Sequence, residues 1–240
     1  AALALLGAGL AAAASAERFP LKVNPVEILG EAAQDHAAPG YRLETPIDFF
    51  VEAYPSPDGD PPGVFVYISP TPDCRPPPGW AQVLEARNLI WICPLNAGNN
   101  APPPRRILAA LTAAAALSEK RELDPDRTYL GGLSGGARIA SLAIGRAPDE
   151  FEGAMYFVGA SSWETSDPDQ IAKIIDRRFV FFTGHADFTR ELVLRVAAEY
   201  EAAGAQQLQL LDLPGVGHEL PNAQGLDRIL AYLDERPQAD

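Results

Sequence analysis

Short runs typical of β-strands alternate with runs typical of helices along most of the chain, and this alternation constrains the fold more than any other feature. Residues 64–69 (VFVYIS) are mostly β-branched or aromatic, and clusters of Pro, Asp and Gly bound such runs. Residues 105–122 instead contain the helix-favouring sequence AALTAAAAL, and Asp124-Pro125 ends it. Strands alternating with helices predict the α/β class, with a mostly parallel sheet and helices on both faces.

The same patterns predict the other elements between residues 47 and 234. The expected strands are residues 47–54, 64–69, 89–93, 128–130, 153–158, 178–183 and 207–213. The expected helices are residues 79–87, 105–122, 137–146, 189–203 and 222–234. The segment before residue 47 is polar and contains proline, and no element is predicted in it. With 240 residues, 47% of them hydrophobic, the chain can bury the core of a single domain, which we expect to span residues 17–240.

A serine stands among four glycines in residues 128–140 (TYLGGLSGGARIA), where an expected strand meets an expected helix. A phosphate-binding loop would need Lys followed by Ser or Thr after the glycines, whereas an alanine and an arginine follow here. Ser134 would cap the helix in an ordinary connection. The strand-to-helix context favours a third interpretation, the G-x-S-x-G nucleophile elbow, in which small residues such as Gly132 and Gly136 flank a serine on a strained turn.

A serine hydroxyl needs a base to take its proton, and the chain has only three histidines. His36 lies in the polar segment, where a solvated side chain is expected. His185 follows the strand expected at residues 178–183, and His218 follows the last strand. Proteins with this elbow carry their triad in the order Ser, Asp or Glu, His. The order favours His218 as the general base, active in its neutral form, and leaves His185 as a loop residue or a wall of a substrate pocket.

The acid that orients the histidine should follow the strand before it, and Asp187 occupies that place in the sequence FFTGHADFTR. The alternatives are Glu164, Asp167 and Asp169, which follow an earlier strand, and Asp212, which lies in or at the end of the last strand. Each of these carboxylates is otherwise a solvated charge. We therefore expect Asp187 to be the acid of the triad.

Four segments, GGLSGGARIA, APDEFEGAMYFVGAS, TGHADFTR and GVGHELP, resemble those of an α/β-hydrolase of the serine esterase type, and the resemblance covers about residues 64–235. It is greatest to the polyhydroxybutyrate depolymerase and feruloyl esterase group. The resemblance implies a carboxylic ester hydrolase that forms an acyl-enzyme intermediate, with Ser134 as nucleophile, His218 as general base and Asp187 as orienting acid. It implies no metal and no organic cofactor.

The expected oxyanion hole departs from the pattern of these esterases. They usually carry His-Gly after the strand that leads to the oxyanion loop, whereas this chain has Ser69-Pro70-Thr71. One backbone N–H should come from Gly135, the residue after the serine, and a second from that loop. Because Pro70 has no N–H, Thr71 is the expected second donor.

Residues 1–16, AALALLGAGLAAAASA, are apolar and end in the small-x-small pattern of a signal peptidase site, so we expect the remnant of a signal peptide. An alanine-rich helix of the mature protein is the alternative. Export to a secreted or periplasmic location would bring Cys74 and Cys93 into an oxidising compartment, where they either pair or remain thiols. In an α/β-hydrolase both lie just past the ends of neighbouring strands, and this predicts a disulfide that braces the loop 71–78.

The net charge of −13 argues against nucleic acid or an anionic membrane as a partner. The expected partner is an ester, small or polymeric, and the apolar leader is too short for a comfortable membrane span. A short connection at residues 161–178 predicts an open pocket without a large lid, bordered by Trp80 and Trp163 unless these rings pack in the interior. The alternative functions are a serine peptidase, an acyltransferase, or a catalytically silent binding module on the same scaffold.

Overall fold

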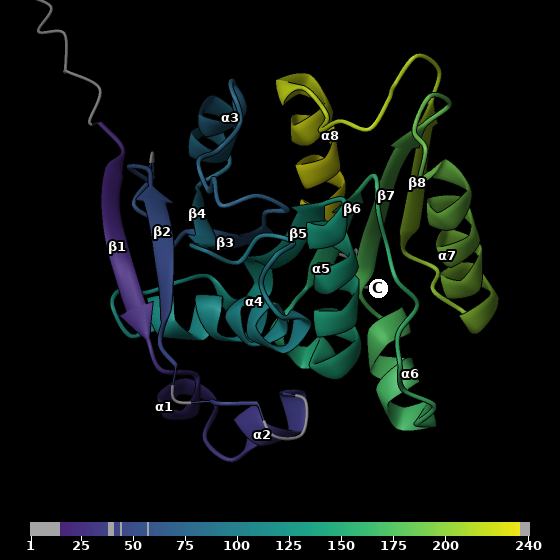
Figure 1. Cartoon of the computed structure of the whole chain (residues 1–240). Helices are drawn as coiled ribbons and strands as arrows, with labels where there is room; N and C mark the ends of the chain where they lie inside the picture. Colours follow the sequence, from purple (N-terminus) through teal and green to yellow (C-terminus); the bar gives the residue numbers. More distant parts are fainter. Residues whose placement is uncertain (1–14, 38–40, 44, 57, 236–240) are drawn as a thin grey trace, which may run out of the picture.

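An eight-stranded sheet forms the centre of the protein in the computed structural model, which describes residues 15–37, 41–43, 45–56 and 58–235 (Figure 1). The expected signal peptide therefore lies almost wholly outside the described residues. The strands are β1 (Glu17–Val23), β2 (Ile47–Ala53), β3 (Gly63–Ile68), β4 (Leu89–Pro94), β5 (Thr128–Leu133), β6 (Gly153–Phe157), β7 (Arg178–Gly184) and β8 (Leu208–Leu213). They lie in the order β1-β2-β4-β3-β5-β6-β7-β8. Of the described strand pairs, only β1–β2 and β2–β4 are antiparallel, so the sheet is mostly parallel, as predicted.

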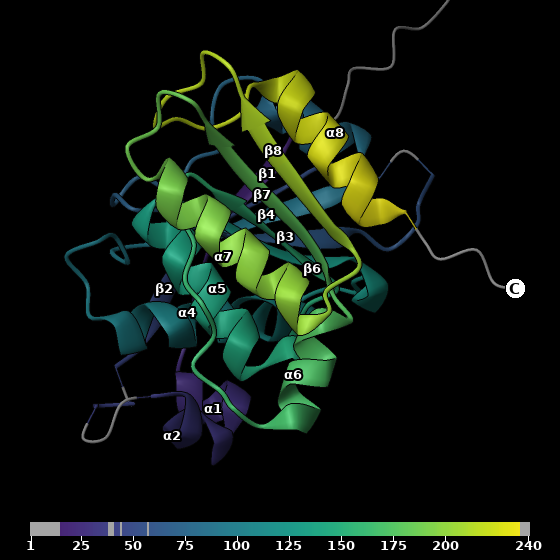
Figure 2. The same ribbon diagram turned by 90° about the vertical axis from the view of Figure 1, so that its right-hand side faces the viewer.

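Helices cover both faces of the sheet (Figure 2). One face carries α4 (Pro103–Ser118), α5 (Gly135–Arg146) and α7 (Arg190–Ala203), and the other carries α3 (Trp80–Ala86) and α8 (Ala223–Asp234). Shorter helices are α1 (Pro25–Leu29), α2 (Ala32–His36), α6 (Pro168–Ile175), η1 (Pro125–Arg127) and η2 (Pro148–Glu150). Side chains alternate between the two cores along each strand. In β3, Val64 and Val66 pack under α4 and α5, whereas Phe65 and Tyr67 pack under α3 and α8.

The segment before residue 47 has more structure than the sequence predicted. β1 forms an edge strand, in which Leu21 and Val23 are buried and the other side chains are exposed or half-buried. The expectation of a solvated His36 is wrong as well, because His36 ends α2 half-buried and its carbonyl accepts a 2.6 Å hydrogen bond from Arg146. Burial, followed by the charge of Arg146, lowers the pKa of the His36 imidazole.

The connection between β6 and β7 contains α6, which the sequence did not predict. This helix packs against α5 and α7, and in Figure 1 it lies at the opposite end of the molecule from the arrowheads of β7 and β8. The described connection therefore forms no large lid over those strand ends. That agrees with the expected open architecture.

Cys74 and Cys93 form the predicted disulfide. Their sulfur atoms are 2.02 Å apart and their Cα atoms 5.4 Å apart. Cys93 is part of β4 rather than past its end, and Cys74 lies in the loop that follows β3. The bond thus fastens the loop after β3 to the neighbouring strand, and such a crosslink typically contributes about 2–4 kcal/mol.

Candidate functional site

Ser134 occupies a sharp turn between β5 and α5. Its φ of 54° and ψ of −114° are unusual for a residue with a side chain and cost about 1–3 kcal/mol. Neighbouring glycines permit the turn, since a Cβ at Gly136 would stand 1.8 Å from the carbonyl oxygen of Ile68 and one at Gly132 would stand 2.6 Å from it. Ser134 is half-buried, and its hydroxyl has no hydrogen-bond partner among the described residues. This is the local geometry that the glycine pattern predicted.

Asp187 and His218 are joined by a hydrogen bond of 2.7 Å between Oδ1 and Nδ1. The Asp187 side chain is fully buried, whereas His218 is half-buried. Thr183 Oγ1 donates to Asp187 Oδ2 at 2.7 Å, and the backbone N–H of Thr189 donates to Oδ1 at 3.0 Å. Because an ionised carboxylate only accepts hydrogen bonds, Nδ1 of His218 carries the proton, and Nε2 of the neutral ring is left as the acceptor.

The surroundings of Asp187 favour its ionised form. Burial alone would raise the pKa of the carboxyl group. The hydrogen bonds from His218, from the Thr189 backbone and from the hydroxyls of Thr183 and Thr189 outweigh burial and hold the pKa below its ordinary value. At neutral pH a negative charge therefore lies beside the imidazole of His218.

The end of β6 connects the serine turn with the aspartate loop. The Phe157 carbonyl accepts a 2.8 Å hydrogen bond from the Ser134 N–H, and the next carbonyl, of Val158, accepts one of 2.9 Å from Thr189 Oγ1. Gly159 then passes so close that a Cβ would stand 2.4 Å from the Ser134 carbonyl oxygen. Within the described residues Ser134 and His218 are not hydrogen-bonded to each other. Such bonds are often long in free enzymes and tighten only when substrate binds.

The loop that carries His218 is fastened at both ends. The Ala186 N–H donates to the Val216 carbonyl at 3.0 Å, and Trp80 Nε1 donates to the Pro221 carbonyl at 3.0 Å. Gly184 allows this approach, since a Cβ there would stand 2.3 Å from the Val216 oxygen. Because both attachments lie within three residues of His218, the position of the imidazole is well defined.

The side chain of Phe188 stacks on His218, with ring centroids 4.1 Å apart and an angle of 29° between the planes. Phe188 is 81% exposed, which is exceptional for a large apolar side chain in this protein. Its ring covers one face of the imidazole and presents its own outer face to solvent.

The other candidate carboxylates have different partners. Glu164 pairs with Arg146 at 2.7 Å, and Asp167 caps α6 by accepting from the Asp169 N–H at 3.0 Å. Asp212 pairs with Arg190 at 2.6 Å and lies 3.8 Å from Nε2 of the exposed His185. The hydrogen bond from Arg190 is the main cause of a lowered pKa at Asp212. Asp187 is therefore the described carboxylate that contacts His218.

The loop expected to complete the oxyanion hole is tightly held. The Thr71 N–H already donates to Ser69 Oγ at 3.1 Å. Beneath the loop, the 4% exposed Arg106 of α4 donates from Nη2 to the Ser69 carbonyl at 3.2 Å and from Nε to the Ala97 carbonyl at 2.7 Å. No described carboxylate lies within ion-pair distance of Arg106, and burial lowers the pKa of its guanidinium to about 10. Arg106 therefore remains a cation at neutral pH, paired only with carbonyl dipoles.

Trp80 is buried in the interior, whereas Trp163 is half-buried and packs against the core. Trp80 is 1% exposed and lies in an aromatic cluster with Phe65, Tyr67 and Trp91. Trp163 packs against Tyr200, with ring centroids 4.5 Å apart. The role of Trp80 at the site is indirect, through its hydrogen bond to the loop that carries His218.

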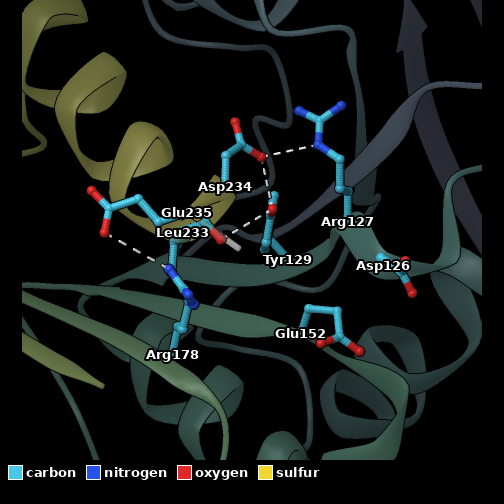
Figure 3. Close-up of a pocket in the computed structure, with 8 residues that line it drawn as sticks. All are labelled: Asp126, Arg127, Tyr129, Glu152, Arg178, Leu233, Asp234 and Glu235. Atoms are coloured by element: carbon cyan, nitrogen blue, oxygen red, sulfur yellow. Dashed lines mark hydrogen bonds and ion pairs between the residues drawn. The ribbon is translucent and has the colours of Figure 1, made fainter. Parts of the chain in front are cut away.

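A charged hollow opens at the opposite edge of the sheet (Figure 3). Tyr129, Glu152 and Arg178, at the beginnings of β5, β6 and β7, line it together with Asp234 of α8. Asp234 accepts hydrogen bonds from Arg127 at 3.0 Å and from the Tyr129 hydroxyl at 2.7 Å. These hydrogen bonds join the end of α8 to the beginning of β5, so we interpret this hollow as the attachment of α8 to the sheet.

No family model matches the sequence, and no curated protein matches it. Solved structures do match. A ferulic acid esterase superposes with a TM-score of 0.64 at 14% identity, over 91% of this chain and 97% of that one. The protein has the α/β-hydrolase fold. An S-formylglutathione hydrolase from Staphylococcus aureus superposes with a TM-score of 0.60 at 11% identity, over 92% of this chain and 98% of that one.

The α/β-hydrolase fold is also shared by a puromycin-hydrolysing peptidase from Mycobacterium tuberculosis. It superposes with a TM-score of 0.55 at 16% identity, over 82% of this chain and 40% of that longer one. In this fold ligands bind at the carboxyl ends of the strands, where Ser134, Asp187 and His218 follow β5, β7 and β8.

No described helix is long and apolar enough to cross a membrane. Among the described residues, no group of three or more His, Cys, Asp or Glu side chains is placed to hold a metal ion.

Proposed function

We propose that the protein is a serine hydrolase that cleaves carboxylic esters through an acyl-enzyme intermediate. The observation that carries this proposal is the 2.7 Å hydrogen bond between buried Asp187 and His218, in an α/β-hydrolase fold whose strained serine turn follows β5. Nucleophile, orienting acid and base then occur in the chain order that the fold requires.

In the proposed reaction, Ser134 Oγ attacks the ester carbonyl carbon while Nε2 of His218 takes the hydroxyl proton. The carbonyl oxygen gains the negative charge and is stabilised by the Gly135 N–H and a second donor. The intermediate collapses when His218 gives its proton to the leaving alcohol oxygen and the carbon–oxygen bond breaks. Water, activated by His218, then attacks the acyl-enzyme and releases the acid. Asp187 stabilises the imidazolium that forms in both halves of the reaction.

The esters proposed as substrates are uncharged and fit an open site. The connection that contains α6 does not cover the ends of β7 and β8 (Figure 1), and the exposed ring of Phe188 offers an apolar surface beside His218. The ferulic acid esterase and the S-formylglutathione hydrolase with the same fold support an ester or thioester over an amide. Amide hydrolysis is the second candidate activity, because a peptidase has the same fold.

The test combines a fluorophosphonate probe with a short p-nitrophenyl ester and a peptide amide. We expect the wild-type protein to be labelled and to hydrolyse the ester, and Ser134→Ala to lose both activities while keeping its circular dichroism spectrum. Ser166→Ala, which removes an exposed hydroxyl, is the matched control. Faster cleavage of the amide than of the ester would favour the peptidase. Absence of both labelling and hydrolysis would favour the silent binding module.

We also propose that the protein is exported and that residues 1–16 are removed. The Cys74–Cys93 disulfide favours an oxidising compartment. In addition, β1 begins at Glu17, directly after the small-x-small pattern, so a cut there would leave the sheet intact. N-terminal sequencing of protein recovered from the periplasm or medium should begin at Glu17. Recovery of exported protein that retains residues 1–16 would contradict this proposal.

A further inference from the structure

Asn99, in the loop after β4, places its side chain directly against Gly135, the residue that follows Ser134. A Cβ at Gly135 would stand 2.1 Å from Oδ1 and 3.0 Å from Nδ2 of Asn99. The residue is exposed, and its side-chain amide has no hydrogen-bond partner among the described residues. An unpaired amide group therefore stands beside the backbone N–H that is expected to hold the oxyanion.

Residues 70–72 of the loop after β3 offer no free backbone donor. Pro70 and Pro72 lack an N–H, and the N–H of Thr71 between them is engaged with Ser69 Oγ at 3.1 Å. The Ser69 hydroxyl also contacts Thr71 Oγ1 at 3.2 Å. Using Thr71 as the second donor would require this turn to open.

The backbone of Asn99 is held in place by that same loop. The Asn99 N–H donates to the Pro70 carbonyl at 2.8 Å. Gly98 permits the approach, since a Cβ there would stand 3.0 Å from the Pro70 oxygen. Arg106 joins the two loops from below through the Ser69 and Ala97 carbonyls. A donor on a fixed backbone needs little reorganisation when charge develops, which is what makes such donors effective.

We propose that the Asn99 side-chain amide is the second oxyanion donor, acting together with the Gly135 N–H. This inference rests on the ester hydrolysis proposed above. Rotation about the last side-chain bond turns Nδ2 toward the carbonyl oxygen of the bound ester. The N–H donates a hydrogen bond that strengthens as the oxygen becomes negative, and no proton is transferred. Thr71 is then a support of the loop rather than a donor.

The test compares Asn99→Ala and Asn99→Asp with Asn100→Ala, which removes the neighbouring exposed amide of the same loop. With a p-nitrophenyl ester, Asn99→Ala should lower kcat by about 10²–10³-fold with little change in KM, the usual cost of losing one oxyanion donor. Asn99→Asp keeps the shape but removes the N–H, and should lose at least as much. Asn100→Ala should retain the wild-type rate. Fluorophosphonate labelling should slow in parallel with kcat, because the phosphonyl oxygen occupies the same position.

The outcomes separate this inference from the proposed function. If the wild type neither hydrolyses esters nor reacts with the probe, the proposed function fails and Asn99 has no oxyanion to bind. The second outcome is an active wild type, an inactive Ser134→Ala variant and an unchanged kcat for Asn99→Ala. It would exclude Asn99 as the second oxyanion donor, leave the proposed function standing and make Thr71 the expected donor again. A rise in KM at unchanged kcat would make Asn99 a substrate contact and overturn the inference. Melting temperatures are measured for all variants. If Asn99→Ala is unstable, the kcat of Asn99→Asp decides the outcome instead.

Discussion

The Asp187 carboxylate is the best-supported side chain of the candidate site. Four groups donate to it: the imidazole of His218, the hydroxyls of Thr183 and Thr189, and the Thr189 N–H. A buried charge is tolerated only when it is paired and hydrogen-bonded in this way. The arrangement fixes both the charge of Asp187 and the orientation of the imidazole.

Replacing Asp187 by Asn should therefore lower kcat for ester hydrolysis by about 10⁴-fold, because Asn favours the wrong tautomer of His218 while preserving size. Steady-state kinetics on a p-nitrophenyl ester measures the loss. Glu164→Gln, Asp167→Asn and Asp169→Asn serve as controls, since these exposed carboxylates lie away from His218. A small effect at Asp187 beside a large one at any control would assign the acid to the connection between β6 and β7.

The lowered pKa of Asp187 also predicts how stability depends on pH. A carboxyl group with a lower pKa in the folded state stabilises the fold above its unfolded pKa, about 3.9, and loses that contribution as pH falls through the folded value. Thr183→Val removes a donor to the carboxylate and should cost about 1.5–3 kcal/mol at pH 7. The cost should shrink as pH falls through the folded pKa of Asp187, which lies below the ordinary value, because the carboxyl group is then protonated.

Urea unfolding of wild type and Thr183→Val at several pH values measures this difference. The matched control is Thr112→Val, because Thr112 is also fully buried but donates to a carbonyl, that of Leu108. Its cost should not vary with pH. A Thr183→Val cost that stays constant through the pH at which folded Asp187 is protonated would show that the hydroxyl does not act through the charge of Asp187.

At the scale of elements, the turn between β5 and α5 depends on the absence of side chains. Gly136→Ala should destabilise the protein by about 1–3 kcal/mol, because the new Cβ meets the Ile68 carbonyl oxygen at 1.8 Å. The higher helix propensity of Ala, worth about 1 kcal/mol, opposes the clash but does not compensate for it. The control is Gly217→Ala, where the Cβ meets nothing within 4 Å and the change should stay within about 0.5 kcal/mol. Equal melting temperatures for the two variants would contradict the clash.

The sequence predicted the strands and helices whose side chains are well buried and missed weakly buried ones such as β1 and α6. β3 and β4 read as continuous apolar runs because both faces are covered. β1 contains Pro20 and several charged residues, as an edge strand tolerates, so its alternation is weak. α6 begins at a proline and buries only Ile174. The patterns that identify strands and helices arise from burial, so weakly buried elements give a weak signal.

Chain order was sufficient to select Asp187 and His218, whose contact the structure contains. It gave no indication of Asn99 or Arg106, because their positions depend on loops from separate parts of the chain coming together. Thr189 could have been inferred from the local sequence. An aspartate side chain commonly accepts a hydrogen bond from the backbone N–H two residues later, as Asp187 does from Thr189. Supporting residues of a site are therefore harder to predict than the residues they support.

At the scale of the whole molecule, the net charge of −13 acts on every approaching substrate. Anionic esters should have lower kcat/KM than neutral esters of the same length, because the field of the protein repels them. The gap should narrow as ionic strength rises from about 0.01 to 0.5 M, where the screening length falls from about 30 Å to a few ångströms. Paired assays on a neutral ester and its carboxylated analogue test this. A gap that does not respond to salt would point to a local contact instead.

The hydrogen bond from Trp80 to the Pro221 carbonyl links positions separated by 141 residues. The loop with His218 therefore reaches its final place only after the chain between them has been synthesised and α3 and α8 have docked on the same face. Contacts between such distant residues form slowly, since the loop they close has a large entropic cost. Catalytic competence should thus appear late in refolding, together with the burial of Trp80. A newly synthesised chain should therefore not hydrolyse esters until its core is complete.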